Sequence, residues 1–181
     1  IVFTGNHDLW MFGYLEDELG VRIHREPISI THGKSKIYIG HGDGLGPGDH
    51  GYKFIKKVFT NKVCQFLFKW LQPDLGVPLA SYLSKSSREG ESPAELKFLG
   101  EEREWLITYS KQILEKEHFD YFVFGHRHVP IKYQLNNSVY VNLGDWLSNF
   151  TFGVLENDTL SLKRFDAVGN HSDIGFNKST T

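Results

Sequence analysis

Residues 121–128 read Tyr-Phe-Val-Phe-Gly-His-Arg-His, so four apolar residues run directly into a glycine and two histidines. A short apolar run that ends at a glycine is typical of a buried β-strand. Two similar blocks occur earlier: Gly-Asn-His-Asp at 5–8 follows the apolar run 1–4, and Gly-His-Gly-Asp at 40–43 follows 36–39. All three blocks therefore place polar side chains at the carboxyl end of an expected strand, the edge at which α/β sheets bind ligands.

The polar side chains of these blocks are of the kinds that bind transition metals. Imidazole nitrogens and an amide oxygen together suit Mn, Fe, Zn or Co. His126 and His128 are two residues apart, and on an extended backbone such side chains project to the same side. They can then contact one metal, or one each of two adjacent metals. We expect the histidines outside the blocks to be ordinary core or surface residues: His24, His32, His50, His118 and His171.

The composition is that of an ordinary globular domain. The chain has 181 residues, 40% of them hydrophobic and 23% charged, and its formal net charge is −2. These values exclude a disordered, collagen-like or disulfide-rich chain. The single cysteine, Cys64, excludes an internal disulfide and fits a reducing compartment. The nearly balanced charge argues against a dedicated nucleic-acid binder.

The spacing of apolar residues and of Gly, Pro and Asn predicts a mixed α/β chain. Tyr52–Leu71 has helical periodicity with a break at Asn61, and 84–90 is expected to be a polar loop. The tail from Val168 is expected to be loose. Further helices are expected at Leu9–Leu19, at Leu79–Leu83 and from Pro93, capped by Ser92, to about Glu117. Strands are expected at Ile1–Thr4, Pro27–Thr31, Lys36–Ile39, Asp120–Phe124, Val139–Leu143, Phe150–Leu155 and Thr159–Phe165.

The helical segment is unusually basic. Residues 53–88 contain seven basic side chains and one acidic one, Asp74, which is a net charge of +6 against −8 for the rest of the chain. Such a basic and aromatic segment can lie against an anionic membrane surface or cover a lipid substrate. The alternative is a pair of helices packed on the sheet with solvated lysines.

Taken in order, the three blocks resemble the last three signature blocks of the calcineurin-like metallophosphoesterases. The resemblance implies an α/β fold, a β-sandwich flanked by helices, in which 1–181 is the C-terminal portion of the domain and 50–92 a helical cap inserted in it. It implies two divalent metals, Mn foremost, with Fe, Zn or Co as alternatives. The implied metal ligands are Asn6, His41 and His126 for one metal and His128 for the other. The implied catalytic imidazole is His7, oriented by Asp8.

The first two signature blocks of this family, Asp-x-His and Gly-Asp-x-x-Asp, are expected upstream of Ile1. Asp17 and Asp43 come too late in the chain to replace them. We therefore expect further residues before Ile1, and we expect the chain to be inactive without those ligands.

A narrower resemblance is to the UDP-2,3-diacylglucosamine hydrolases of lipid A biosynthesis. It rests on His-Gly-Asp-Gly-Leu at 41–45, the basic aromatic helix, Ser-Lys-Ser-Ser-Arg at 84–88 and Leu-Gly-Asp-Trp at 143–146. It implies cleavage of UDP-2,3-diacylglucosamine to UMP and 2,3-diacylglucosamine 1-phosphate. The implied substrate contacts are Asp49, Tyr52, Lys85 and Arg88.

This resemblance also implies a cytoplasmic protein that is peripheral on the inner membrane of a Gram-negative bacterium, with a UDP-linked lipid as partner and no nucleic acid. Two alternatives stay open. One is another phosphodiesterase or phosphatase of the calcineurin-like superfamily. The other is a non-catalytic relative that binds membrane surfaces.

Overall fold

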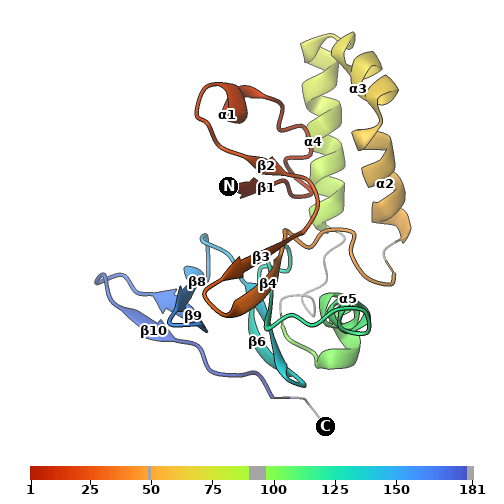
Figure 1. Ribbon diagram of the computed structural model, residues 1–181. Helices are drawn as coiled ribbons and strands as arrows, with labels where there is room; N and C mark the ends of the chain where they lie inside the picture. Colours follow the sequence, from red (N-terminus) through yellow and green to blue (C-terminus); the bar gives the residue numbers. More distant parts are fainter. Residues whose placement is uncertain (49, 90–96, 179–181) are drawn as a thin grey trace.

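The structure is a computed structural model that describes residues 1–48, 50–89 and 97–178, with only the backbone described for 83–89. Two β-sheets and one helix form the body of the molecule, and a group of three helices extends away from the sheets (Figure 1). A small parallel pair of strands, β1 (Val2–Phe3) and β2 (Ile23–His24), lies between the body and these helices.

The main sheet has five strands in the order β3-β4-β5-β7-β6. The three inner strands run parallel to one another, and each outer strand is antiparallel to its neighbour. The carboxyl ends of the parallel strands β4 and β5 consequently lie side by side at one edge of the sheet. The strands are β3 (Ile28–His32), β4 (Ser35–Ile39), β5 (Tyr121–Phe124), β6 (Pro130–Leu135) and β7 (Ser138–Leu143).

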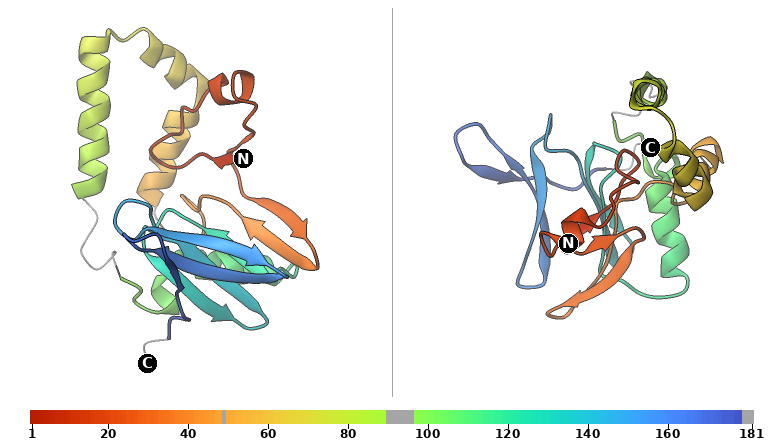
Figure 2. Two further views of the ribbon diagram at one scale, coloured as in Figure 1. Left: turned by 90° about the vertical axis from the view of Figure 1, so that its left-hand side faces the viewer. Right: turned by 90° about the horizontal axis from the view of Figure 1, so that it is seen from above.

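Both faces of this sheet are covered, which explains why β5 is apolar throughout rather than alternating. Phe122 and Phe124 pack with Leu106 of α5 (Trp105–Leu114) on one face. Val123 packs with Leu160 of the second sheet on the other face. That sheet is antiparallel, in the order β10-β9-β8 (Figure 2). Its strands are β8 (Thr151–Glu156), β9 (Thr159–Phe165) and β10 (His171–Asp173). The predicted α/β sandwich with flanking helices is confirmed.

We call the three extended helices the helical arm: α2 (His50–Thr60), α3 (Lys62–Lys69) and α4 (Pro73–Glu89). The break predicted at Asn61 is confirmed, because the Asn61 side chain accepts hydrogen bonds from the backbone N–H groups of Val63 (2.8 Å) and Cys64 (3.2 Å) and caps α3. No residue of α2 or α3 is buried, so the alternative of helices packed on the sheet is wrong. Among the described residues, no helix is long and apolar enough to cross a membrane.

Several predicted boundaries are wrong. The predicted polar loop 84–90 is helical as far as Glu89, the end of α4. The helix predicted for 9–19 is only α1 (Tyr14–Asp17), with Gly13 at its N-cap. The long helix predicted from Pro93 begins instead at Trp105, after the 3-10 turn η2 (Glu101–Arg103). Its predicted start at Ser92 and Pro93 lies outside the described residues.

Three strands were not predicted from the sequence: β2, β6 and β10. β6 begins at a proline, and its residues Ile131–Leu135 alternate buried apolar with more exposed polar side chains, so the signal for this strand was present in the sequence. β10 lies within the predicted loose tail and is held by pairing with β9. β2 pairs with β1, about 20 residues upstream, whereas β6 and β10 each pair with the neighbouring strand along the chain.

Candidate functional site

The second and third glycine-anchored blocks lie side by side where β4 and β5 end. The Gly40 N–H donates to the Val123 carbonyl oxygen (3.1 Å), and the Gly125 N–H donates to the His41 carbonyl oxygen (2.9 Å). These bonds continue the parallel pairing past the ends of both strands. The centres of the His41 and His126 rings are 5.4 Å apart. Two of the three blocks therefore meet at one sheet edge, as their positions after parallel strands predict.

The first block reaches the same edge although β1 is not part of the main sheet. A Cβ atom added to Gly5 would fall on Nε2 of His41, nearer than nonbonded atoms approach. Only glycine allows this approach, which brings the Asn6–Asp8 turn to the His41 ring. Asn6 is half-buried, whereas His7 and Asp8 are exposed. The Asp8 carboxylate accepts a hydrogen bond from the Gly5 N–H, so it stabilises this turn.

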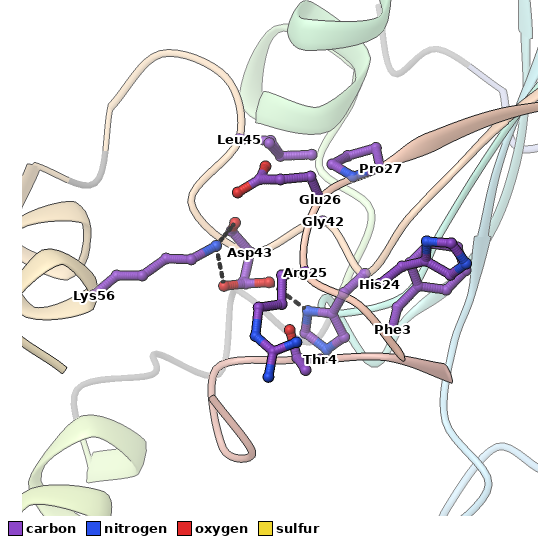
Figure 3. A pocket seen from close by; sticks show the side chains of 11 residues that line it. Phe3, Thr4, His24, Arg25, Glu26, Pro27, Gly42, Asp43, Leu45 and Lys56 are labelled. Atoms are coloured by element: carbon purple, nitrogen blue, oxygen red, sulfur yellow. Dashed lines mark hydrogen bonds and ion pairs between the residues drawn. The ribbon is translucent and has the colours of Figure 1, made fainter. Parts of the chain in front are cut away.

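Asp43 orients His41. Oδ1 of Asp43 lies 2.9 Å from Nδ1 of His41, while Oδ2 accepts from the Lys56 ammonium (2.8 Å) and the Tyr52 hydroxyl (2.6 Å). Figure 3 shows Lys56 reaching Asp43 from the arm. Burial by itself raises the pKa of Asp43, but the hydrogen bonds from these three side chains together hold that pKa well below its usual range.

The tautomer of His41 follows from this network. An ionised carboxylate can only accept hydrogen bonds, so Nδ1 of His41 carries the proton toward Asp43. The lone pair of a neutral imidazole is then on Nε2, the atom that faces Gly5. Histidines that bind a metal through one ring nitrogen commonly donate the N–H of the other ring nitrogen to a carboxylate, as His41 does to Asp43.

The Nδ1 nitrogen of His126 is buried. In the part of the chain that the structure describes, its Nδ1 atom has no contact with solvent and no hydrogen bond. Burial, with a smaller effect of the neighbouring His41, lowers the pKa of His126 to about 4, so the ring is neutral near pH 7. A neutral imidazole with an unsatisfied nitrogen is the state in which histidine binds a metal.

The structure corrects the prediction that His126 and His128 share one side of an extended backbone. Their φ angles are +66° and +55°, in the left-handed region, because β5 ends at Phe124 and the chain turns after Gly125. Non-glycine residues in this region are uncommon. His128 is exposed, and its position relative to His126 depends on the turn and not on strand alternation.

Side chains from other segments hold this turn, which we call the 125–128 loop. Nδ2 of Asn142 donates to the Gly125 carbonyl oxygen. Nδ2 of Asn149 donates to the His128 carbonyl oxygen (2.9 Å). Asn142 is fully buried at the end of β7 and Asn149 follows it in the loop before β8, so the segment after β7 fixes both ends of the 125–128 loop.

The structure describes the side chain of only one of the remaining predicted site residues, Tyr52. Tyr52 lies on α2 with its hydroxyl on Asp43, so this residue predicted to contact substrate also supports the His41 network. Lys85 and Arg88 belong to helix α4, where only the backbone of these residues is described. Asp49 lies outside the described residues. Sequence reasoning missed the roles of Asp43 and Lys56, although the His-Gly-Asp spacing at 41–43 was a usable signal for Asp43.

The donor set fits a divalent metal. His41, His126, His128 and the Asn6 amide supply nitrogen and oxygen ligands of the type that Mn, Fe, Zn and Co accept. Nδ1 of His126 is buried and has no hydrogen bond among the described residues, which favours a bound metal as its partner. Within residues 1–48, 50–89 and 97–178, no group of three or more His, Cys, Asp or Glu side chains is gathered closely enough to hold a metal by itself.

Comparison with known proteins places this site in a family. No family model matches the chain. A UDP-2,3-diacylglucosamine hydrolase of Porphyromonas gingivalis is 30% identical over 177 residues, covering 91% of this chain and 68% of that protein. The chain thus belongs to the calcineurin-like metallophosphoesterases, and within them to the UDP-2,3-diacylglucosamine hydrolase family. The resemblance drawn from the glycine-anchored blocks is confirmed, and the curated relative is named as a hydrolase.

Two solved structures also match. Vps29 of Entamoeba histolytica complexed with Zn²⁺ has a TM-score of 0.39 and 16% identity, covering 84% of this chain. A single mutant of the same protein has a TM-score of 0.37 and 14% identity, covering 83% of this chain. The chain spans 61% of the length of each of these structures.

Proposed function

We propose that this protein hydrolyses UDP-2,3-diacylglucosamine to UMP and 2,3-diacylglucosamine 1-phosphate. The observation that carries the proposal is the 30% identity, over 91% of the chain, to a hydrolase named for that substrate. One water is consumed: its oxygen bonds to a phosphorus of the pyrophosphate, the bridging P–O bond breaks, and the departing phosphate oxygen takes a proton. The meeting of His41, His126 and the Gly5 turn at one sheet edge supports this chemistry.

We propose that Asn6, His41 and His126 hold one divalent metal and His128 a second, with Mn²⁺ as the physiological ion. When bound, such metals supply a nucleophile at neutral pH and neutralise charge on the phosphate oxygens. Asp43 keeps His41 in the tautomer that leaves Nε2 available. Burial keeps His126 neutral.

For the proton we propose His7, which is exposed on the turn that Gly5 brings to this edge. An imidazole there can protonate the departing phosphate oxygen. Asp8 acts on His7 through the backbone of the turn, because its carboxylate bonds to the Gly5 N–H. This differs from direct orientation of His7 by Asp8, the role that the family resemblance implies.

We propose that the arm, within a cap at 50–92, receives the acyl chains of the substrate and rests on the inner membrane surface. Exposed apolar side chains support this, among them Phe54 (68% exposed), Phe66 (58%) and Trp70 (77%). The lysines of the arm complement anionic lipid headgroups. The proposed contacts to sugar and phosphate are Asp49, Tyr52, Lys85 and Arg88.

The test is release of UMP from UDP-2,3-diacylglucosamine by the full-length protein with Mn²⁺, assayed beside a soluble phosphodiester, bis(p-nitrophenyl) phosphate. UMP release that depends on Mn²⁺ is the expected result. Hydrolysis of the soluble ester alone would favour another calcineurin-like phosphodiesterase or phosphatase. Binding to anionic vesicles without hydrolysis of either compound would favour a non-catalytic membrane-surface protein.

A further inference from the structure

An ion pair joins Arg127 of the 125–128 loop, which is partly buried, to the buried Glu104, and the function proposed above gives it no role. Arg127, between the two histidines, turns its guanidinium inward, where Nε lies 3.2 Å from Oε2 of Glu104. The Tyr140 hydroxyl is 3.4 Å from the other carboxylate oxygen. Glu104 is 2% exposed and Tyr140 is fully buried. The pair therefore links the loop to the start of α5 and to β7.

Stability by itself is a weak explanation for this pair. Removing two charges from water costs about as much as their attraction returns, so a buried ion pair contributes little net stability compared with apolar side chains of similar volume. A guanidinium that is hydrogen-bonded to a buried carboxylate does, however, hold a defined separation and orientation. Such a pair is suited to fixing the geometry of the chain at Arg127.

The 125–128 loop is a place where geometry has to be imposed. His126 and His128 both have positive φ angles, a backbone conformation that is unfavourable for non-glycine residues unless the surroundings stabilise it. Asn142 and Asn149 hold the carbonyl groups of Gly125 and His128 at the two ends of the loop. The centre of the loop is held by Arg127, whose Nε bonds to the buried carboxylate of Glu104.

We propose that Arg127, anchored by Glu104, is a positioning residue that sets the relative placement of the His126 and His128 side chains for metal binding. The proposal rests on the metal site of the proposed function. In this arrangement Arg127 and the two flanking histidines form one unit: Arg127 fixes the backbone through its bond to Glu104, and the histidines on either side of it are presented to the metals.

The test compares metal affinity with thermal stability in the full-length protein. Mn²⁺ is titrated calorimetrically into wild type and into the double variant Glu104→Met/Arg127→Met, which removes both charges while keeping similar volumes. The expected result is a melting temperature close to that of wild type and a Kd for Mn²⁺ raised about 10- to 100-fold, the usual loss when a partner of a metal ligand is removed.

Two further variants complete the design. Arg127→Lys keeps the charge but lacks the planar guanidinium, so its Kd for Mn²⁺ should also rise about tenfold or more. If the double variant does not fold, the Mn²⁺ affinity of Arg127→Lys tests the positioning role by itself. The matched control is Tyr133→Phe, which removes a hydroxyl–carboxylate bond to Glu101 (2.5 Å) in the same core cluster as Tyr140, without a partner in the loop. Its Mn²⁺ affinity should equal that of wild type.

The outcomes separate the two proposals. If wild type binds no Mn²⁺, the proposed function fails and the positioning role fails with it. If wild type binds Mn²⁺ and the folded Arg127 variants bind it equally well, the positioning role is overturned while the proposed function stands. Weaker binding by Tyr133→Phe as well would show a general effect of core substitutions and would also overturn it.

Discussion

The sheet edge and the helical arm use apolar and polar residues in opposite ways. At the edge, His41, Asp43 and Arg127 are each held by hydrogen bonds from separate segments over a core in which Phe122 and Phe124 are fully buried. On the arm, Phe66 and Trp70 are more than half exposed and no residue of α2 or α3 is buried. The fold thus fixes the edge closely and leaves the arm an apolar surface, which suits chemistry at one and recognition of a lipid at the other.

The largest effect is expected at the edge from His41→Ala. Because His41 is proposed as a metal ligand, turnover of the UDP-lipid should fall by orders of magnitude, while circular dichroism and melting temperature stay close to wild type. His32→Ala, at an exposed histidine on β3, is the control and should keep full activity. Normal turnover in His41→Ala would remove His41 from the metal site.

The next effect is expected from Gly5→Ala, because the added methyl group collides with Nε2 of His41. The His41 ring or the Asn6 turn has to move, so the Kd for Mn²⁺ measured by calorimetry should rise. The control is Gly51→Ala on α2, where an added Cβ meets nothing within 4 Å and alanine favours the helix by about 1 kcal/mol. Equal Mn²⁺ affinity in both variants would show that this approach of Gly5 does not matter.

A smaller effect, of a different kind, is expected from the arm. The double variant Phe66→Ser/Trp70→Ser should bind anionic phospholipid vesicles about tenfold or more weakly, since burying one such side chain is worth about 1.5–3 kcal/mol. Its melting temperature should barely change because both side chains are exposed. Val168→Ser, at an 84% exposed position away from the arm, is the control for vesicle sedimentation. Unchanged vesicle binding would leave the arm without the proposed role.

The smallest effect concerns pH and lies at Asp145. Burial tends to raise the pKa of Asp145, but hydrogen bonds from the backbone of Ser148 and from Asn149 outweigh it and bring the pKa to about 2. A depressed carboxyl pKa stabilises the fold above the unfolded value of about 3.9 and loses that contribution as the pH falls through 2. Asp145→Asn should therefore lower the melting temperature slightly at pH 6 and less at pH 2.5. A melting-temperature difference between Asp145→Asn and wild type that is larger at pH 2.5 than at pH 6 would contradict this.

The fold was largely predictable where local signals are strong. The runs that become β4 and β5 end in glycine, and Asn61 separates two helices as its capping preference indicates. The short strand β2 could not be predicted because its pairing with β1, about 20 residues away in the chain, specifies it. The edge strand β6 was missed although it alternates apolar and polar residues and pairs with the next strand, β7. The true start of the helix at Trp105 also escaped prediction, since the periodicity upstream of it is equally helical.

The meeting of two predicted blocks at one sheet edge was predictable from the sequence, but the geometry of the 125–128 loop was not. Glycine followed by histidine identified His41 and His126, yet no pattern indicated the left-handed backbone of the 125–128 loop. The roles of Lys56 and Glu104 escaped prediction because their partners lie 13 and 23 residues away along the chain. Such contacts depend on how the helices meet the sheet edge, which the sequence does not display locally.

The measurement that tests the account most directly is the metal content of the full-length protein after loading with Mn²⁺ and dialysis. Wild type should retain about two Mn²⁺ per chain, the number expected of a dinuclear phosphoesterase. His126→Ala, which removes the buried unpaired nitrogen, should retain one or none. Wild type without Mn²⁺, or His126→Ala with as much as wild type, would contradict a metal centre at the ends of β4 and β5.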